Sequence, residues 1–498
     1  MNKINRFNLI DEPWIPIVDV GCVSLRQLFS HFDYNALGGN PIEKIALMKL
    51  LLAIAQSACT PLDDNDWEEL GVNGLSEKCL AYLERMYDLF WLYGEKPFLQ
   101  MPQIACAKTK TFGAVLPEVA TGNTTVLNEM QVEKSLCDAE KTLLVLSLMG
   151  CALGGKKTDN TVVLSEGYQG KQNMKGKEAS GSPGSFLGTF GLMHSFILSD
   201  SLLKTIFSNL VTKACLEEKL TFYSEGLGIA PWEKMPEGEE CPTAISLINS
   251  LMGRLVPLSR FCLLTEKSLH YSEGIRYPNH KEGGVDPSIT SNFSGEKSKA
   301  LWVDPEKRPW RHLTAQLSFM TQSTTKDRRD CYQIQLCLGR ARKISVDRLG
   351  IWSGGLKISS NAGEQYVSGM DDFVDSTILL PVEHLGKSWY EQLKLEMEIL
   401  DELSKILYSS VVKYFKNLKV EGTKTAKASC NLFWQLCERH SRNLLIACKS
   451  PEEAKAMRKR VFISCINKVY DQFCHKNTAR QLDSWSNNRP NLKKYFIE

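Results

Sequence analysis

The last quarter of the sequence carries a helical repeat of apolar residues that constrains the fold more than any other feature. Over residues 389–418, apolar side chains recur every three or four positions, at Leu393, Met397, Leu400, Leu403, Leu407 and Val411. This spacing puts them on one face of a helix, which must then be buried against a partner. A second helix is predicted over residues 424–448, with one face formed by Phe433, Leu436, His440, Leu444 and Cys448.

A third helix is predicted to begin at Ser450. Serine is a good N-cap, Pro451 suits the first helical position, and Glu453 at the third position would close a capping box. The apolar face of this helix continues through Met457, Val461, Cys465 and Val469. A short fourth helix is expected near Arg480, before Pro490. Four antiparallel helices with short links predict a four-helix bundle over residues 386–498.

The preceding part of the chain is predicted to be a large mixed body, residues 1–385. Helical patterns occupy residues 43–58, 77–91, 143–153 and 193–210. Patterns typical of strands occupy residues 14–20, 255–264, 316–320 and 332–338. Because strands and helices do not alternate regularly, a doubly wound parallel sheet is not indicated. The predicted fold class is α+β, a large mixed N-terminal domain followed by a C-terminal four-helix bundle.

Charge is divided unevenly between these two parts. The whole chain has 60 basic and 57 acidic residues, a net +3, which by itself argues against binding to nucleic acid. Residues 386–498, however, hold 21 basic and 12 acidic residues, so the bundle is +9 and the body is −6. The densest basic run is Lys455, Arg458, Lys459 and Arg460. By itself, such a run is typical of a solvated helix face.

Composition places the chain among globular cytoplasmic proteins. Apolar residues make up 43% of the sequence, and the longest apolar run, residues 142–155, is too short to span a bilayer. The N-terminus has no apolar core typical of a signal peptide. Sixteen cysteines are scattered without any C-x-x-C pair, so they are predicted to be reduced core residues.

Local signatures of catalysis are weak. Residues 150–157 match G-x-x-x-x-G-K, but Lys157 stands where a phosphate-binding loop needs serine or threonine, and the preceding apolar run resembles a helix. The histidines are isolated. The acidic pairs and triplets, Asp63, Asp64, Asp66, Asp371 and Asp372, are predicted to be solvated loop carboxylates. We therefore predict no enzyme activity, no metal and no cofactor.

A glycine-rich loop occupies residues 167–191. It contains seven glycines together with Lys171, Lys175 and Lys177. Glycine lets a backbone approach a ligand closely, and backbone N–H groups with lysines suit phosphate oxygens. A flexible surface loop is the alternative explanation.

Several motifs in order resemble one known family. They are FNLIDEPWIP at residues 7–16, SLRQLF at 24–29, KPFLQ at 96–100, GN at 122–123 followed by Val126, Leu127 and Asn128, GGL at 354–356, and ERH at 438–440. This series is similar to the CasA family, the large subunit of the type I-E CRISPR surveillance complex Cascade. The resemblance covers essentially the whole chain.

The resemblance implies a non-catalytic, DNA-binding function. Members of the family recognise the protospacer-adjacent motif (PAM) in double-stranded DNA, help to open the duplex and recruit the helicase-nuclease that follows R-loop formation. The implied partners are the backbone, small, Cas5-type and guide-processing subunits of Cascade, the CRISPR RNA and the target DNA, with no membrane. Base pairing by the guide would supply sequence specificity, while the protein would read the short motif and DNA shape.

Three DNA-contacting regions are implied by the resemblance. A loop that contacts the PAM and the guide end would include Val126, Leu127 and Asn128, although Val126 stands where some relatives carry an aromatic residue. The glycine-rich loop would act through Gly167, Gly170 and Lys171, with residues 182–184 as a second choice. A basic finger, residues 271–276, aligns Arg276 with a lysine of relatives. A cation suits a narrow minor groove, whose degenerate code predicts a permissive PAM.

A β-hairpin is implied to separate the DNA strands below the PAM. The matching wedge hairpin here is residues 356–365, with Lys357, Asn361 and Gln365 as the candidate wedge residues. Unstacking a base step costs a few kcal/mol, so a wedge must act together with groove contacts. A plain surface hairpin is the alternative. The resemblance also gives the basic bundle a role, in which Lys455, Arg458, Lys459 and Arg460 would hold backbone phosphates of the target or displaced DNA strand. At the level of the whole chain, the alternatives are a nucleotide-binding protein that uses residues 150–157 and a purely structural scaffold subunit.

Overall fold

The computed structural model describes residues 5–116, 134–150, 158–159, 161–165, 191–278, 284–292, 299–321, 331–344, 349–357 and 373–497. The chain divides into two compact units. The first comprises Met1–Pro305 and Lys326–Thr377, and the second comprises Glu306–Thr325 and Ile378–Glu498. The second unit thus includes a segment from within the predicted body. The division at residue 385 stays a prediction about independently folding domains.

Helix α2 (Pro41–Ala58) forms the centre of the first unit. Its start is fixed by Asn40, whose side chain accepts hydrogen bonds from Ile42 N and Glu43 N, while the Glu43 side chain accepts from Asn40 N. The helix is apolar on nearly all sides, which is typical of a fully buried helix. It packs against α3 (Asp64–Arg85) and α5 (Asp138–Gly150).

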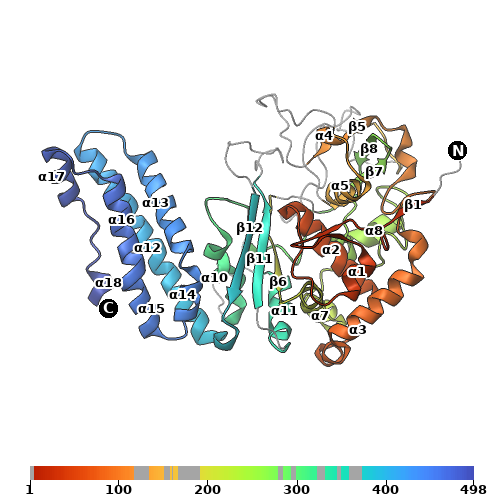
Figure 1. The fold of residues 1–498 in the computed structure, drawn as a ribbon, viewed down its shortest axis with the longest axis horizontal. Helices are drawn as coiled ribbons and strands as arrows, with labels where there is room; N and C mark the ends of the chain where they lie inside the picture. The colour runs from red at the N-terminus through yellow and green to blue at the C-terminus, as the bar shows by residue number, and fades with distance from the viewer. Residues whose placement is uncertain are drawn as a thin grey trace. The chain divides into compact units, whose positions relative to one another are not determined.

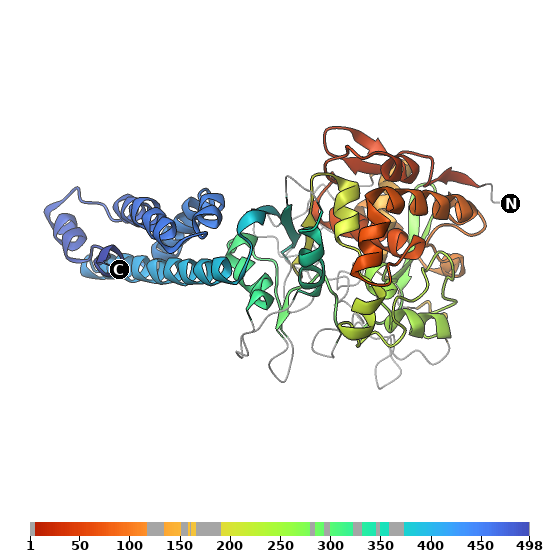
Figure 2. The same cartoon turned by 90° about the horizontal axis from the view of Figure 1, so that it is seen from below.

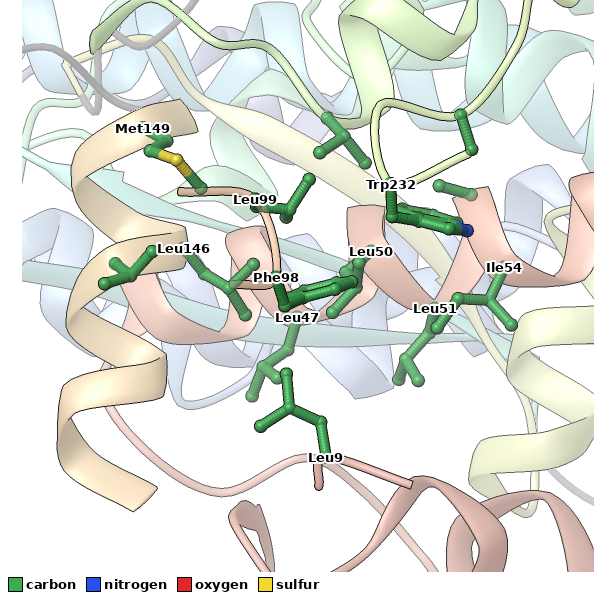
Figure 3. Close-up of a cluster of buried hydrophobic side chains, with 14 of the residues drawn as sticks. Leu9, Leu47, Leu50, Leu51, Ile54, Phe98, Leu99, Leu146, Met149 and Trp232 are labelled. Atoms are coloured by element: carbon green, nitrogen blue, oxygen red, sulfur yellow. The ribbon is translucent and has the colours of Figure 1, made fainter. Parts of the chain in front are cut away.

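The core around α2 joins segments that are far apart in the sequence (Figure 3). From α2 come Leu47, Leu50, Leu51 and Ile54, from α5 come Leu146 and Met149, and from other segments come Leu9, Phe98, Leu99 and Trp232. The Phe98 ring stacks on Phe90 and Trp232, with centroid distances of 4.8 and 5.8 Å. This cluster anchors α5 beside α2.

Two three-stranded sheets lie in the described part of the first unit, apart from residues 378–380 at the end of one strand, which belong to the second unit (Figure 1). One has the order β5-β8-β7 and is formed by β5 (Thr109–Thr111), β8 (Ser268–Glu273) and β7 (Arg260–Leu264). The other has the order β12-β11-β6 and is formed by β12 (Phe373–Leu380), β11 (Leu349–Leu356) and β6 (His194–Leu198). The strand pairs for which registers are described are antiparallel, as an α+β fold requires.

Shorter elements complete the first unit. The two-stranded sheets pair β1 (Arg6–Asn8) with β4 (Trp91–Tyr93), β2 (Ile15–Ile17) with β3 (Gly21–Val23), and β9 (Ser291–Asn292) with β10 (Lys299–Ala300). The helices are α1 (Leu25–Ser30), α4 (Phe112–Val115), α6 (Leu202–Ser208), α7 (Lys213–Glu218), α8 (Pro242–Ile248), α9 (Met252–Leu255) and α11 (Tyr332–Ala341), with 3-10 turns at Tyr87–Leu89 and Pro102–Cys106.

The second unit is helical. Its longest element is α12 (Lys387–Asn417), a continuous helix seen clearly in Figure 2. The other helices are α13 (Thr423–Glu438), α14 (Ser441–Ala447), α15 (Pro451–Met457), a π-helical turn (Arg458–Phe462), α16 (Ile463–Phe473), α17 (Ala479–Asn487) and α18 (Lys494–Ile497). Helix α12 packs against α13, α15, α16 and α17. Before it come α10 (Leu313–Gln316) and 3-10 turns at Pro309–His312, Ser318–Met320 and Val382–His384.

For three stretches of the sequence, the predicted type of secondary structure is wrong. Residues 193–210 form β6 and then α6, because Ser201 ends the extended stretch and caps α6 at Lys204 N. Residues 332–338 form helix α11, not a strand: their polar-apolar alternation resembles that of a strand, but the buried side chains recur at helical spacing. Residues 316–320 fall at the end of α10 and in a 3-10 turn.

The predicted bundle helices are broken more often than expected. The helix predicted over residues 424–448 ends at Glu438 and restarts at Ser441. The third predicted helix is interrupted by the π-helical turn. Its N-cap is confirmed, because Ser450 Oγ accepts a hydrogen bond from Glu453 N at 3.2 Å.

The cysteines in the described part of the chain are all free. Most are buried or half-buried, and burial raises the pKa of thiols such as Cys331, to about 12. Cys22, Cys106 and Cys137 are exposed, so the prediction of core cysteines was wrong for these three. Among the helices of the described residues, none combines the length and the apolar character needed to cross a membrane.

Candidate nucleic-acid interface

The predicted basic finger continues the β7–β8 hairpin. After β8 ends at Glu273, antiparallel pairing persists, because Gly274 N donates to Ser259 O at 3.1 Å and Ile275 N donates to Leu258 O at 2.8 Å. Side chains alternate along such extended backbone. Ile275 and Tyr277 are therefore buried, and Arg276 between them is exposed. The hairpin thus presents the Arg276 guanidinium at the surface.

Gly274 lets the two backbone segments of the finger approach closely. A Cβ at this position would lie 2.4 Å from Leu258 O and 2.8 Å from Arg260 N. Both contacts are to backbone atoms, which cannot rotate away as a side chain can. The close approach of the two backbone segments therefore requires glycine at position 274, two residues before Arg276.

The substitution Gly274→Ala is expected to lower the free energy of unfolding by about 1–3 kcal/mol, the usual cost of overpacking. Gly339→Ala, inside α11, is the matched control, because a Cβ there has no neighbour within 4 Å. This control should be neutral or slightly stabilising, since alanine favours a helix over glycine. Chemical denaturation of both variants measures the difference. Equal stability of the two variants would contradict the close approach.

The predicted wedge hairpin starts from the central strand of the second sheet. All eight residues of β11 are buried, and a Cβ on Gly354 would lie 2.5 Å from the Trp352 ring and 2.9 Å from Val374 O. Lys357 follows β11 directly and is half-buried. Asn361 and Gln365 lie outside the described residues, and β12 resumes at Phe373.

Both other predicted loops lie outside the described residues. These are Val126, Leu127 and Asn128, between α4 and α5, and Gly167, Gly170 and Lys171 with residues 182–184 of the glycine-rich loop. The flanks of the glycine-rich loop are described. Before it, the Glu239 carboxylate accepts hydrogen bonds from Leu164 N at 3.0 Å and Ser165 N at 2.8 Å. After it, Gly191 O accepts from Val303 N at 2.7 Å.

Backbone pairing joins the flanks of these regions. His194, three residues after Gly191, pairs with Gly354 of β11 on one side and bridges Ile289 on the other. Asp159, ahead of the glycine-rich loop, bridges Ser272 of β8 in the finger. The chain ahead of the glycine-rich loop is therefore joined to the finger hairpin at Asp159, and the chain after it is joined at His194 to the strand that leads into the wedge hairpin. The finger and the wedge strand belong to different sheets, and each pairs with one flank of the glycine-rich loop.

The basic run of the second unit is divided by the π-helical turn. Arg460 is exposed, and Lys455 and Lys459 are half-buried. Arg458 is buried, and its Nε lies 3.4 Å from Oε2 of Glu396 on α12. The expectation that Arg458 contacts DNA phosphates is therefore corrected: its guanidinium is turned into the bundle and paired with a buried carboxylate.

The alternative of nucleotide binding loses its structural basis. Gly150, the first residue of the G-x-x-x-x-G-K match, is the last residue of helix α5, and residues 151–157 lie outside the described part. A phosphate-binding loop of this type follows a strand. Among the described residues, no group of three or more histidine, cysteine, aspartate or glutamate side chains converges as a metal site. Asp63, predicted to be a solvated carboxylate, instead caps α3 through Asn65 N and Asp66 N.

A buried polar cluster was missed by the sequence reasoning. It joins Lys49, Asp286, Ser288 and His194, all of which are nearly inaccessible to solvent. The one available signal was Lys49, a lysine inside the apolar run of residues 45–55. A buried lysine requires a partner, but the sequence does not show which carboxylate supplies it.

Comparisons with known proteins agree with this architecture. A family model described as CRISPR-associated protein Cse1 matches residues 8–463. A curated CRISPR-associated protein CasA/Cse1 of Thermus thermophilus is 33% identical over 162 residues, which span 29% of this chain and 32% of that protein. The aligned part is thus about a third of this relative.

Solved structures match over nearly their full length. The crystal structure of Thermus thermophilus CasA has a TM-score of 0.72 and 18% identity, covering 98% of this chain and 99% of that one. Thermobifida fusca Cse1 has a TM-score of 0.76 and 18% identity, covering 98% of both chains. A chain of a structure described as a CRISPR RNA-guided surveillance complex has a TM-score of 0.73 and 15% identity, covering 100% of both chains. These likenesses show the fold, and the family model spans most of the sequence, so this chain belongs to the Cse1 family of CRISPR-associated proteins.

Proposed function

We propose that this chain is the non-catalytic large subunit of a type I-E CRISPR RNA-guided surveillance complex. In this proposal it recognises the PAM in double-stranded DNA, helps to open the duplex and recruits the helicase-nuclease. Membership of the Cse1 family supports the assignment, as does the likeness to a chain of an RNA-guided surveillance complex. Its partners would be CRISPR RNA, the other Cascade subunits and target DNA.

One observation supports the DNA-opening function most strongly. One flank of the glycine-rich loop pairs with the finger through Asp159 and Ser272, and its other flank pairs with the strand that leads into the wedge hairpin through His194 and Gly354. A protein that reads a short motif and separates the adjacent base pair needs these two functions within a few base steps of each other, because unstacking must be offset by groove contacts. The two pairings connect the glycine-rich loop to both regions, which supports a joint function of the three regions in reading and opening DNA.

Each region would contribute a different contact. Arg276 would enter the minor groove as a cation, and the glycine-rich loop, through Gly167, Gly170 and Lys171, would bring backbone N–H groups near the PAM. Asn128 of the guide-end loop would hydrogen-bond a base or backbone edge. In the wedge hairpin, Gln365 or Asn361 would fill the first opened base step, with Lys357 near the phosphates.

The second unit would add contacts to the DNA backbone. Arg460, Lys455 and Lys459 remain the candidates, in a bundle segment with net charge +9. Each phosphate that a cation neutralises releases counterions, so binding should weaken as salt rises. Because the whole chain is close to neutral, this proposal has it bind DNA as part of a larger basic assembly.

Replacing Asn128 and Gln365 together with alanine is expected to weaken PAM-dependent binding of duplex DNA by about tenfold, roughly the free energy of one good base contact. A target that is already open at the PAM-proximal base pairs should bind as tightly as it does to the original complex, because it needs no wedge. The measurement is the Kd of the assembled complex for both targets. Equal affinity of the variant and the original complex for duplex DNA would rule out both residues.

If this chain were a scaffold without a DNA-reading function, the same experiment would give a different result. Complexes would then bind duplexes that differ only in the PAM with equal affinity, whether or not the residues are replaced. A PAM preference that disappears when this chain is omitted from the complex would exclude the scaffold.

A further inference from the structure

The finger leads into residues 277–286, a segment whose middle lies outside the described residues and whose two ends are both held by buried side chains. At the first end is Tyr277, which follows Arg276 directly and is 1% exposed. Its hydroxyl accepts a hydrogen bond from Leu258 N at 3.2 Å. The Arg254 guanidinium lies 5.5 Å from the centre of the Tyr277 ring and 5.8 Å from that of the Tyr223 ring, so one cation contacts two aromatic faces.

The second end of this segment is held at Val285 and Asp286. The Tyr223 hydroxyl donates to Val285 O at 2.8 Å. Lys49 of α2 donates to the Asp286 carboxylate and also to Arg254 O, the latter at 3.1 Å. Lys49 and Asp286 are 5% and 1% exposed, so this is a buried ion pair. Arg254 thus contacts the first end of this segment through the Tyr277 ring, and Tyr223 contacts the second end through Val285 O.

The Asp286 carboxylate is also tied to the sheet that leads to the wedge. Asp286 Oδ1 accepts from Ser288 N at 3.0 Å and from Ser288 Oγ at 2.7 Å. Since that hydroxyl proton points to the carboxylate, Ser288 Oγ accepts from His194 Nδ1 at 2.8 Å. His194 is the residue that pairs with Gly354. Burial alone would raise the pKa of Asp286, but the Lys49 and His194 charges outweigh it and hold the pKa well below its usual value.

We propose that Lys49, Arg254 and Tyr223, with Asp286, form a clamp that holds Tyr277 on one side and Val285 and Asp286 on the other, and so fixes the position of the Arg276 guanidinium next to Tyr277. These are positioning residues, because all four are buried and none of them can contact DNA. The physical reason is that a side chain whose neighbouring backbone is fixed has fewer conformations to lose on binding. A buried ion pair is a poor source of stability but selects one arrangement of the segments that it joins. The inference deepens the proposed function of Arg276 and rests on it.

The first test measures the clamp without DNA. The variant Lys49→Met with Asp286→Asn removes both charges together, and asparagine keeps an acceptor for Ser288. Trypsin can cut the intact chain after Arg276, directly before Tyr277, and after Lys281, which lies between Tyr277 and Val285 in the sequence. If the clamp holds this part of the chain, cleavage at these two sites should become about tenfold faster in the variant, since cleavage follows local opening.

A matched control removes another lysine–aspartate pair from the same helix. Lys44 Nζ lies 2.6 Å from Asp375 Oδ2, and both side chains are more exposed than the clamp pair. Lys44→Met with Asp375→Asn should leave cleavage after Arg276 and Lys281 unchanged. Tyr223→Phe removes only the hydrogen bond to Val285 O, and it is expected to speed cleavage about threefold, as loss of one hydrogen bond would. If the double variant does not fold, the cleavage rate of Tyr223→Phe alone tests the clamp.

The second test measures coupling to Arg276 in the assembled complex. The clamp variant should weaken PAM-dependent duplex binding about tenfold, while a pre-opened target binds unchanged. Combined with Arg276→Ala, it should add little further loss, because residues that act through one group are non-additive. Full additivity, or unchanged cleavage in both the double variant and Tyr223→Phe, would overturn the clamp. If Arg276→Ala alone binds like the original complex, the proposed function of Arg276 fails, and cleavage still decides the clamp.

Discussion

Replacing Arg458 with methionine is expected to lower the free energy of unfolding by about 3–5 kcal/mol, the usual cost of removing one partner from a buried ion pair. Its partner Glu396 is 1% exposed and lies between α12 and the π-helical turn. Besides Arg458, Glu396 contacts Gln392 Nε2, which donates to its Oε1 at 3.1 Å. Without the guanidinium, a buried carboxylate would have only this neutral donor.

The loss of stability should grow as the pH rises. Burial raises the pKa of Glu396 above its ordinary value of 4.5, and the Arg458 charge only partly offsets this. The stability that such a group contributes is present below the unfolded pKa and is lost as the pH rises through the folded pKa. Removing Arg458 raises the folded pKa further. Near pH 5 the Glu396 carboxyl of the variant then stays protonated, and the loss of stability is small. Near pH 8 this carboxyl must either be buried as a charge or bind a proton, so the loss of stability is larger.

Two matched variants separate this mechanism from a general disturbance of the bundle. Lys459→Met, at the next position, changes a half-buried lysine and should shift stability by less than about 0.5 kcal/mol. Arg458→Met with Glu396→Gln removes both charges and should recover most of the loss. Denaturation of the three variants between pH 5 and pH 8 gives the comparison. A deficit for Arg458→Met that does not depend on pH would exclude Glu396 as the cause.

Reversing the charge of the finger, Arg276→Glu, should weaken binding of PAM-containing duplex DNA by about 30-fold, or roughly 2 kcal/mol. The side chain is exposed between two buried neighbours, so the substitution changes the surface charge while the hairpin core stays intact. An anion placed in a narrow minor groove would be repelled by the phosphates on both sides. Binding of a target already open at the PAM-proximal base pairs should change much less.

Arg85→Glu is the control for the charge change itself. Arg85 is exposed in the last turn of α3, in the same unit as Arg276, and it is not in a region assigned to DNA. Its reversal should leave duplex binding within about twofold, while Arg276→Lys should restore most of the affinity because the groove needs a cation. If both reversals weaken duplex binding equally, long-range electrostatics would explain the loss and Arg276 would have no specific contact.

Helices with a long repeat of apolar residues at helical spacing could be predicted from the sequence, because few other structures bury such a stripe. The pattern at residues 43–58 matches α2, and the pattern at residues 389–418 matches α12. Short apolar runs were ambiguous. The stretch at residues 332–338 alternates like a strand, but in the structure the neighbouring residues Gln333 and Ile334 are buried together, and so are Cys337 and Leu338, which is the spacing of a helix face.

The candidate site was predictable only as separate motifs. Short motifs indicated the finger and the wedge hairpin, but nothing in them indicated that Ser272 pairs with Asp159 or that Gly354 pairs with His194. Strand pairing over such long separations depends on the whole sheet, which local patterns do not encode. The same limit explains why Lys49 was not linked to Asp286, 237 positions later in the chain.

The sequence by itself determined the α+β class, the helical C-terminal part, the uneven charge and, through its ordered motifs, the family. These properties depend on composition and on spacing along the chain, which folding leaves unchanged. Only the tertiary structure decided which charges reach solvent: Arg458 and Lys49 are turned into buried ion pairs, whereas Arg276 is held at the surface between Ile275 and Tyr277. The reason is that exposure is set by what packs against a residue, and those neighbours come from distant parts of the chain.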